Sequence, residues 1–77
     1  MDEAARLHGE ALEIDRRLGR LAEQAIHLAN LGTVAAERGN SHEARRLWAE
    51  ALELFERLGA EAQIKQTRAN LESLPPE

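Results

Sequence analysis

The sequence has no cysteine, no tyrosine and only two prolines, which stand together near its end. Without cysteine there is no disulfide, no thiolate nucleophile and no cysteine-ligated zinc site. No apolar run approaches the roughly 18 residues of a membrane-spanning helix, and the polar start MDEAARLHGE does not resemble a secretory signal peptide. We therefore expect a cytoplasmic protein with no contact to a membrane.

Positive charge is not concentrated anywhere along the chain. The ten Lys and Arg residues are dispersed, and the formal net charge is −4 at pH 7. Nucleic-acid binding requires a basic patch or stripe that faces the phosphates, so we expect no direct nucleic-acid partner. The 77 residues allow one small domain with a marginal core, since a chain of this size buries only about 60% of its unfolded surface. Burial shared with a neighbour is therefore expected.

An internal repeat with a period of forty residues runs through the chain. The segment EALEIDRRLG at 10–19 matches EALELFERLG at 50–59, and the triplet Ala-Asn-Leu at 29–31 recurs at 69–71. Sixteen residue pairs are identical at this offset, more than the biased composition produces by chance. A period between 20 and 50 residues is typical of proteins built from stacked helical units.

Apolar residues at helical spacing and a few punctuating residues divide the repeat into helices. We predict four helices, over 2–18, 21–38, 41–58 and 61–74. Gly19 is expected to end the first helix in the left-handed conformation, and Gly39 and Gly59 are expected to end the second and the third. Asn40, with Glu43 three residues later, is the pattern of a capping box at the start of the third helix, and the proline pair ends the fourth. Such short connections make neighbouring helices antiparallel.

The stretch from 28 to 59 resembles the tetratricopeptide repeat (TPR). The matching positions are Leu31, Gly32, Gly39, Ala44, Trp48 and Ala51. In this family the small residues let two helices approach closely, and the large aromatic residue fills the gap between them. Ala35 departs from the pattern because a large aromatic residue is usual there, and Glu56 replaces a helix-ending proline. The period of forty resembles the longer variety found in bacterial signalling and transcription regulators and in kinesin light chains.

The resemblance implies an all-α fold in which antiparallel helix-turn-helix repeats stack as a short solenoid. Residues 1–77 then form a single TPR-like domain with helices in the order B-A-B-A. It would consist of a half repeat at 2–19, a complete repeat at 22–59 and a terminal helix at 61–74. The alternative is a generic antiparallel four-helix bundle. A bundle would pack the last helix on the first, whereas a stack makes contacts mainly between sequential neighbours.

Members of this family usually bind an extended peptide or a helix on the concave surface lined by their A helices. Carried over by position, that surface comprises Ile26, Asn30, Thr33, Glu37, Gln66, Ala69, Asn70 and Ser73. Asn30 and Asn70 stand where the family often uses asparagine to bond a ligand's backbone or terminal carboxylate, although this asparagine is also common where no peptide binds. Ala29, Ala69 and Ile26 occupy the places of the basic residues in a carboxylate clamp, so we expect no binding of acidic C-termini.

The B-A-B-A order leaves the apolar stripe of the first helix without a partner. This stripe contains Leu7, Ala11 and Ile14. An exposed apolar patch of this kind needs a cover, and an isologous homodimer would supply one. Structural self-assembly through this face is the alternative function.

No residue pattern predicts catalysis or metal binding. His8, His27 and His42 stand on separate predicted helices with no second ligand four residues away, which argues against a zinc site. Ser41 and Ser73 lack a partner in a catalytic pattern, and no phosphate-binding glycine loop occurs. We therefore expect neither an enzyme nor a cofactor, but a non-catalytic scaffold for protein or peptide partners.

Overall fold

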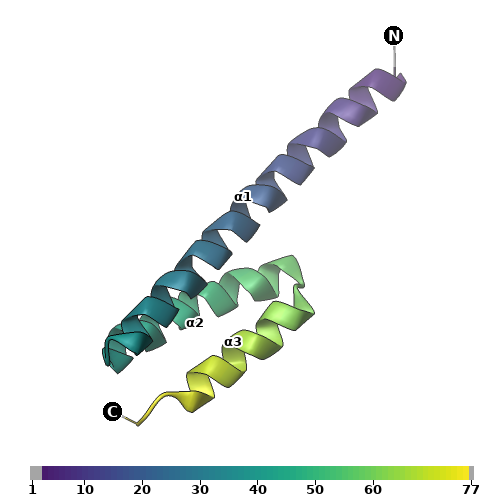
Figure 1. The fold of residues 1–77 in the computed structure, drawn as a ribbon. Helices are drawn as coiled ribbons and strands as arrows, with labels where there is room; N and C mark the ends of the chain where they lie inside the picture. The colour runs from purple at the N-terminus through teal and green to yellow at the C-terminus, as the bar shows by residue number, and fades with distance from the viewer. Residues whose placement is uncertain (1–2, 77) are drawn as a thin grey trace.

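The computed structural model describes the backbone of residues 3–76 and the side chains of residues 17–76. The fold is all-helical, as predicted, and the described residues contain no strand. Three helices follow one another: α1 from Glu3 to Glu37, α2 from Ser41 to Leu58 and α3 from Glu61 to Ser73. In Figure 1, α2 and α3 lie beside the C-terminal half of α1, and the N-terminal half of α1 projects beyond them.

The predicted helix end at Gly19 is wrong, because α1 continues through this residue without interruption. Arg20 and Leu21 follow Gly19, and neither is a residue that caps a helix N-terminus well. A single glycine inside a helix costs only about 1 kcal/mol relative to alanine. A turn at Gly19 would cost several backbone hydrogen bonds as well. The four predicted helices are therefore three, and residues 3–19 do not form a separate half repeat.

Burial gives a second reason for the continuous helix. The helix α2 packs against both α1 and α3, so the turns on either side of it are stabilised by buried apolar surface. A segment 3–18 folded back on α1 would have one neighbouring helix instead of two. In the repeat, His8 and Asp15 stand in the places of the buried Trp48 and Phe55. Folding back would therefore bury less apolar surface than α2 does.

The helix α2 begins and ends where the sequence predicted. The side chain of Asn40 accepts a hydrogen bond from the Glu43 backbone N–H at 3.3 Å. The reciprocal half of the capping box is not formed, since the Asn40 N–H donates to the backbone of α1 and the Glu43 carboxylate pairs with Arg46. Helices end before Gly39 and Gly59, as predicted, and both glycines adopt the left-handed conformation with φ angles of +78° and +67°.

Trp48 and Gly32 make the closest approach between α1 and α2. The indole of Trp48 is 5% exposed, and its Nε1–H donates a hydrogen bond to the Ala29 carbonyl oxygen at 3.0 Å. A Cβ atom added at Gly32 would lie 2.5 Å from Trp48 Cδ1, so only glycine leaves room for the ring. The expected steric roles of these two residues are thus found in the structure.

The core consists of two small clusters along α2. The first contains Ala35, Ala44, Leu47 and Trp48, with Leu71 of α3 and Leu74, which directly follows α3, packed against it. The second contains Ala25, Ala51 and Phe55, with Ile64 of α3 packed against it. Both clusters include residues of all three helices, so α2 is the element that joins α1 to α3.

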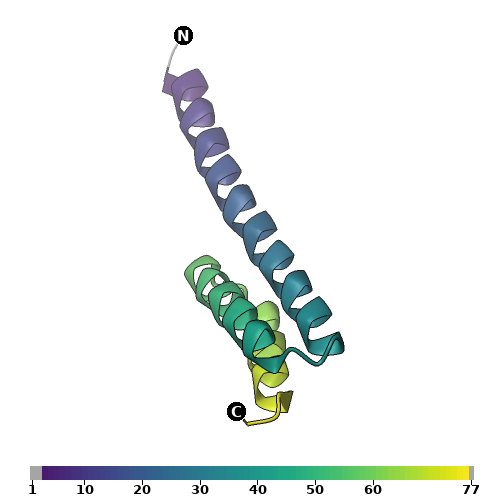
Figure 2. The same cartoon turned by 90° about the vertical axis from the view of Figure 1, so that its left-hand side faces the viewer.

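The molecule is elongated because α1 is longer than the unit it packs against. The radius of gyration is 16.4 Å, whereas a compact domain of this length has about 11 Å. Figure 2 shows that α2 and α3 cover only the C-terminal half of α1. Within the described residues the main helix contacts join sequential neighbours, α1 with α2 and α2 with α3.

Candidate peptide-binding groove

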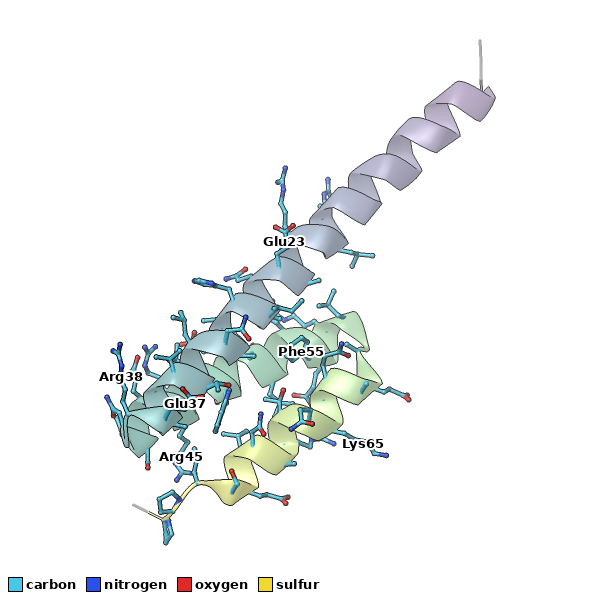
Figure 3. All side chains as sticks on the ribbon, viewed as in Figure 1. Glu23, Glu37, Arg38, Arg45, Phe55 and Lys65 are labelled. Carbon is cyan, nitrogen blue, oxygen red and sulfur yellow. The ribbon has the colours of Figure 1, made fainter. Side chains whose placement is uncertain are left out.

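A groove of about 280 Å³ lies between α1 and α3, with α2 at its floor. Figure 3 shows Phe55 on α2 in the space between the other two helices. The groove is lined by Ile26, Ala29, Asn30, Thr33, Phe55, Gln63, Gln66, Thr67 and Asn70. All of these residues are uncharged, so the groove presents amides, hydroxyls and apolar groups to a ligand.

Helical periodicity brings the polar residues of the groove together. On α1, Ile26, Asn30 and Thr33 are four and three residues apart, which places them on one face. On α3, Gln63 and Asn70 are seven residues apart and share a face in the same way. Because one tight turn joins α1 to α2 and a second joins α2 to α3, α1 and α3 run in the same direction. Their two stripes lie opposite each other across the groove.

The side-chain hydrogen bonds leave part of this surface available. Gln66 Nε2 donates to Asn70 Oδ1 at 3.0 Å. The hydroxyls of Thr33 and Thr67 donate to backbone carbonyl oxygens of their own helices, at 3.1 Å and 2.7 Å. The exposed amide of Asn30 makes no hydrogen bond to any of the residues whose side chains are described. Its donor and acceptor are therefore both available to a ligand.

The structure brings most of the predicted binding residues to this one groove. Ile26, Asn30, Thr33, Gln66 and Asn70 all line it. Glu37, Ala69 and Ser73 are exposed but are not among the lining residues. Glu37 is the last residue of α1, and the Ser73 hydroxyl donates to the Asn70 carbonyl oxygen at 2.7 Å.

Four lining residues were not predicted: Ala29, Phe55, Gln63 and Thr67. Phe55 is only 4% exposed and belongs to the second core cluster, but it also forms the floor of the groove. Thr67 is 3% exposed and is the one buried polar residue among the described side chains. The spacing of Gln63, Thr67 and Asn70 at four and three residues is a signal that could have identified this face of α3 from the sequence.

The proposed self-association residues cannot be placed in the same detail. Leu7, Ala11 and Ile14 lie outside the described side chains. Their backbone belongs to the part of α1 that extends past α2 and α3 (Figure 1).

The charged groups elsewhere form solvated ion pairs. On α2, Arg46 pairs with Glu43 and, at 3.1 Å, with Glu50. The hydrogen bond from Arg46 lowers the pKa of the exposed Glu43 carboxyl below its ordinary value. A carboxylate held ionised on a helix surface is a poor proton donor or acceptor near neutral pH. The described residues contain no group of three or more His, Cys, Asp or Glu arranged to hold a metal ion.

Among the described helices, none combines the length and the apolar character needed to cross a bilayer. Comparison with known proteins adds no family assignment: no protein-family model, no curated protein and no solved structure matches this chain.

Proposed function

We propose that this chain is a non-catalytic interaction module of the tetratricopeptide kind, which binds a peptide or a helix in the groove between α1 and α3. The observation that supports this function is the meeting of Asn30 and Asn70 at one groove. The two residues are forty positions apart and occupy the same place in the internal repeat. Two equivalent amides on parallel helices form a repeated set of contacts suited to an extended chain.

The chemistry of the groove defines the class of ligand. Asn30 and the amide nitrogen of Asn70 are available to bond a peptide backbone, and Ile26, which is 50% exposed, offers apolar contact. No lysine or arginine lines the groove, so nothing there compensates a bound carboxylate. The proposed ligand is therefore an uncharged internal peptide segment with at least one apolar side chain. Each neutral hydrogen bond contributes only about 0.5–1.5 kcal/mol, so affinity is shared among several contacts.

Selection from a random displayed peptide library, followed by titration of the selected peptides, tests this proposal. We expect Asn30→Ala and Asn70→Ala each to weaken binding by roughly threefold to tenfold, the equivalent of one neutral hydrogen bond. The melting temperature should hardly change for Asn30→Ala, since its side chain is exposed and makes no internal bond. Gln24→Ala is the matched control, because Gln24 is an exposed amide on α1 that does not line the groove. Selected peptides that bind both asparagine variants and their double variant like wild type would refute a role for the groove.

A second candidate function is self-assembly through the first part of α1, at Leu7, Ala11 and Ile14. The projection of this half of α1 beyond α2 and α3 favours it, because neither helix covers that part of the chain (Figure 2). Under this hypothesis the wild-type chain is a dimer in solution, and Leu7→Glu converts it to a monomer. Light scattering after size exclusion measures the mass directly, and a wild-type monomer at all concentrations would exclude self-assembly.

A further inference from the structure

Two large apolar side chains of α1 are exposed on a face away from the peptide groove. Leu31 is 41% exposed and Val34 is 42% exposed. They border a separate hollow of about 320 Å³ that also reaches Leu47 of α2. We call Leu31 and Val34 the acceptor face.

The internal repeat shows what covers such a face. The residues forty positions after Leu31 and Val34 are Leu71 and Leu74. Both pack against the buried cluster that contains Leu47 of α2. At these two places of the repeat, Leu71 and Leu74 are therefore covered by α2, whereas Leu31 and Val34 are exposed.

The sequence also contains a second stretch that corresponds to α2, the helix that covers Leu71 and Leu74. The covering helix α2 occupies residues 41–58, and the equivalent stretch of the repeat ends at residue 18. Leu7 and Ala11 in this stretch are identical to their counterparts Leu47 and Ala51, two of the residues that α2 buries. In the structure this segment continues α1 in a straight line, so it cannot reach the acceptor face of its own chain (Figure 1).

We propose that residues 3–18 of a second copy of this chain cover the acceptor face, and that the two copies exchange these segments reciprocally. The inference rests on the self-assembly candidate above and specifies its receiving surface. Such a homodimer is closed, because each copy donates one segment and accepts one. In the homodimer the donated segment packs against the partner's α1, as α2 packs against α3.

The register of the α2–α3 pair supports a reciprocal exchange. In that pair Phe55 packs in one cluster with Ile64, and Trp48 packs in the other with Leu71. Moved back by forty residues, these positions are Asp15 with Gln24 and His8 with Leu31, so they keep the spacing of the pairs but not their apolar character, and both are centred between Gly19 and Arg20. Two straight α1 helices that cross antiparallel at that point therefore reproduce the register without any turn.

The charges along α1 suit the same antiparallel arrangement. In this register Arg16 of one copy falls opposite Glu23 of the other. Residues of opposite charge thus meet on either side of the crossing point. Exposed pairs of this kind contribute little energy. They nevertheless disfavour a parallel in-register arrangement, in which each charged residue would face its identical counterpart.

The first test is the solution mass of the full chain over a range of concentrations. We expect a wild-type dimer, and monomers for Leu7→Glu in the donated segment and for Leu31→Glu and Val34→Glu in the acceptor face. Ile26→Glu is the matched control, because Ile26 is an equally exposed apolar residue of α1 that faces the peptide groove, and it should remain a dimer. If Leu7→Glu dissociates the dimer and both acceptor variants do not, self-assembly stands and the acceptor face is wrong. A monomeric wild type would refute both self-assembly and the acceptor face. None of these mass measurements tests peptide binding in the groove.

A second test separates exchange between copies from folding back within one chain. The absence of cysteine allows a single pair to be introduced, Leu7→Cys in one preparation and Val34→Cys in another. After mixing and mild oxidation, mass spectrometry should detect a disulfide-linked heterodimer as the main product. A chain that carries both substitutions should likewise form linked dimers. An internal disulfide in a monomer of the double variant would show that the segment covers its own chain and would overturn the exchange.

Discussion

Replacing Gly32 by alanine tests the packing at the centre of the fold. The new Cβ atom would lie 2.5 Å from Cδ1 and 2.6 Å from Nε1 of Trp48, well inside any real contact distance. The obstacle is a buried ring rather than the end of a flexible side chain, so the indole or the whole of α2 must move. Because Trp48 also holds the Ala29 carbonyl through its Nε1–H, a displaced ring loses that hydrogen bond.

The expected magnitude follows from three effects. Overpacking in a well-filled interior costs about 1–3 kcal/mol. A buried indole N–H left without its acceptor costs a further 1–3 kcal/mol, roughly. The better helix propensity of alanine returns about 1 kcal/mol. The net change is a loss of about 3 kcal/mol in the free energy of unfolding, or a fall in melting temperature of roughly 15 °C for a domain of this size.

Urea unfolding followed by circular dichroism and by the fluorescence of Trp48, the single tryptophan, measures this change. Protein concentration must be held constant, since association also shifts apparent stability. Gly19→Ala is the matched control, because nothing lies within 4 Å of a Cβ there, and it should stabilise α1 by about 0.5–1 kcal/mol. Trp48→Phe should partly relieve the cost of alanine at Gly32 in the double variant. A Gly32→Ala chain as stable as Gly19→Ala would refute the packing argument.

Two further predictions concern the surface of α2. Asn40→Ala removes the side-chain cap on the Glu43 N–H, and urea titration should show a loss of about 1 kcal/mol. The hydrogen bond from Arg46 lowers the pKa of Glu43, so the pair contributes stability above the unfolded-state pKa and loses it as the pH falls through the lowered value. The melting temperature should therefore drop as the pH falls below the ordinary pKa of a glutamate carboxyl, and drop less in Glu43→Gln or in high salt. If the melting temperature of Glu43→Gln falls as much on acidification as that of the wild type, other carboxyl groups determine the loss of stability in acid.

The sequence predicts the start of α2 well because this limit is local. Asn40 forms the side-chain cap on the Glu43 N–H, so the boundary is determined by residues within one turn of it. The predicted residues that line the groove come from the positions that the resemblance to the tetratricopeptide repeat implies, and helical spacing accounts for their common face. The floor is not among these positions, since Phe55 reaches the groove only because α2 lies between α1 and α3. That arrangement depends on contacts distant in sequence.

The two glycines at 19 and 59 show where local reasoning fails. Both follow the dipeptide Arg-Leu, yet Gly59 ends a helix and Gly19 lies inside one. A missing cap does not distinguish them, because Ala60 after Gly59 provides no side-chain cap either. The difference lies beyond the turn: α3 places Ile64 and Leu71 against the two clusters, whereas residues before Gly19 have no such helix pair to join. Burial, which no short window of sequence contains, decides between turn and helix.

If burial decides, a good cap alone should not bend α1. Arg20→Asn places an asparagine directly after Gly19 and three residues before Glu23, which copies the arrangement of Gly39, Asn40 and Glu43. An N-cap contributes only about 1 kcal/mol, less than the helical hydrogen bonds that a turn would remove. Spin or fluorescent labels on cysteines at positions 3 and 37, in chains diluted with unlabelled protein, should stay about 50 Å apart, the length of a straight helix at 1.5 Å per residue. A collapse of that distance in Arg20→Asn would mean that the cap, and not the buried surface, determines whether this helix continues.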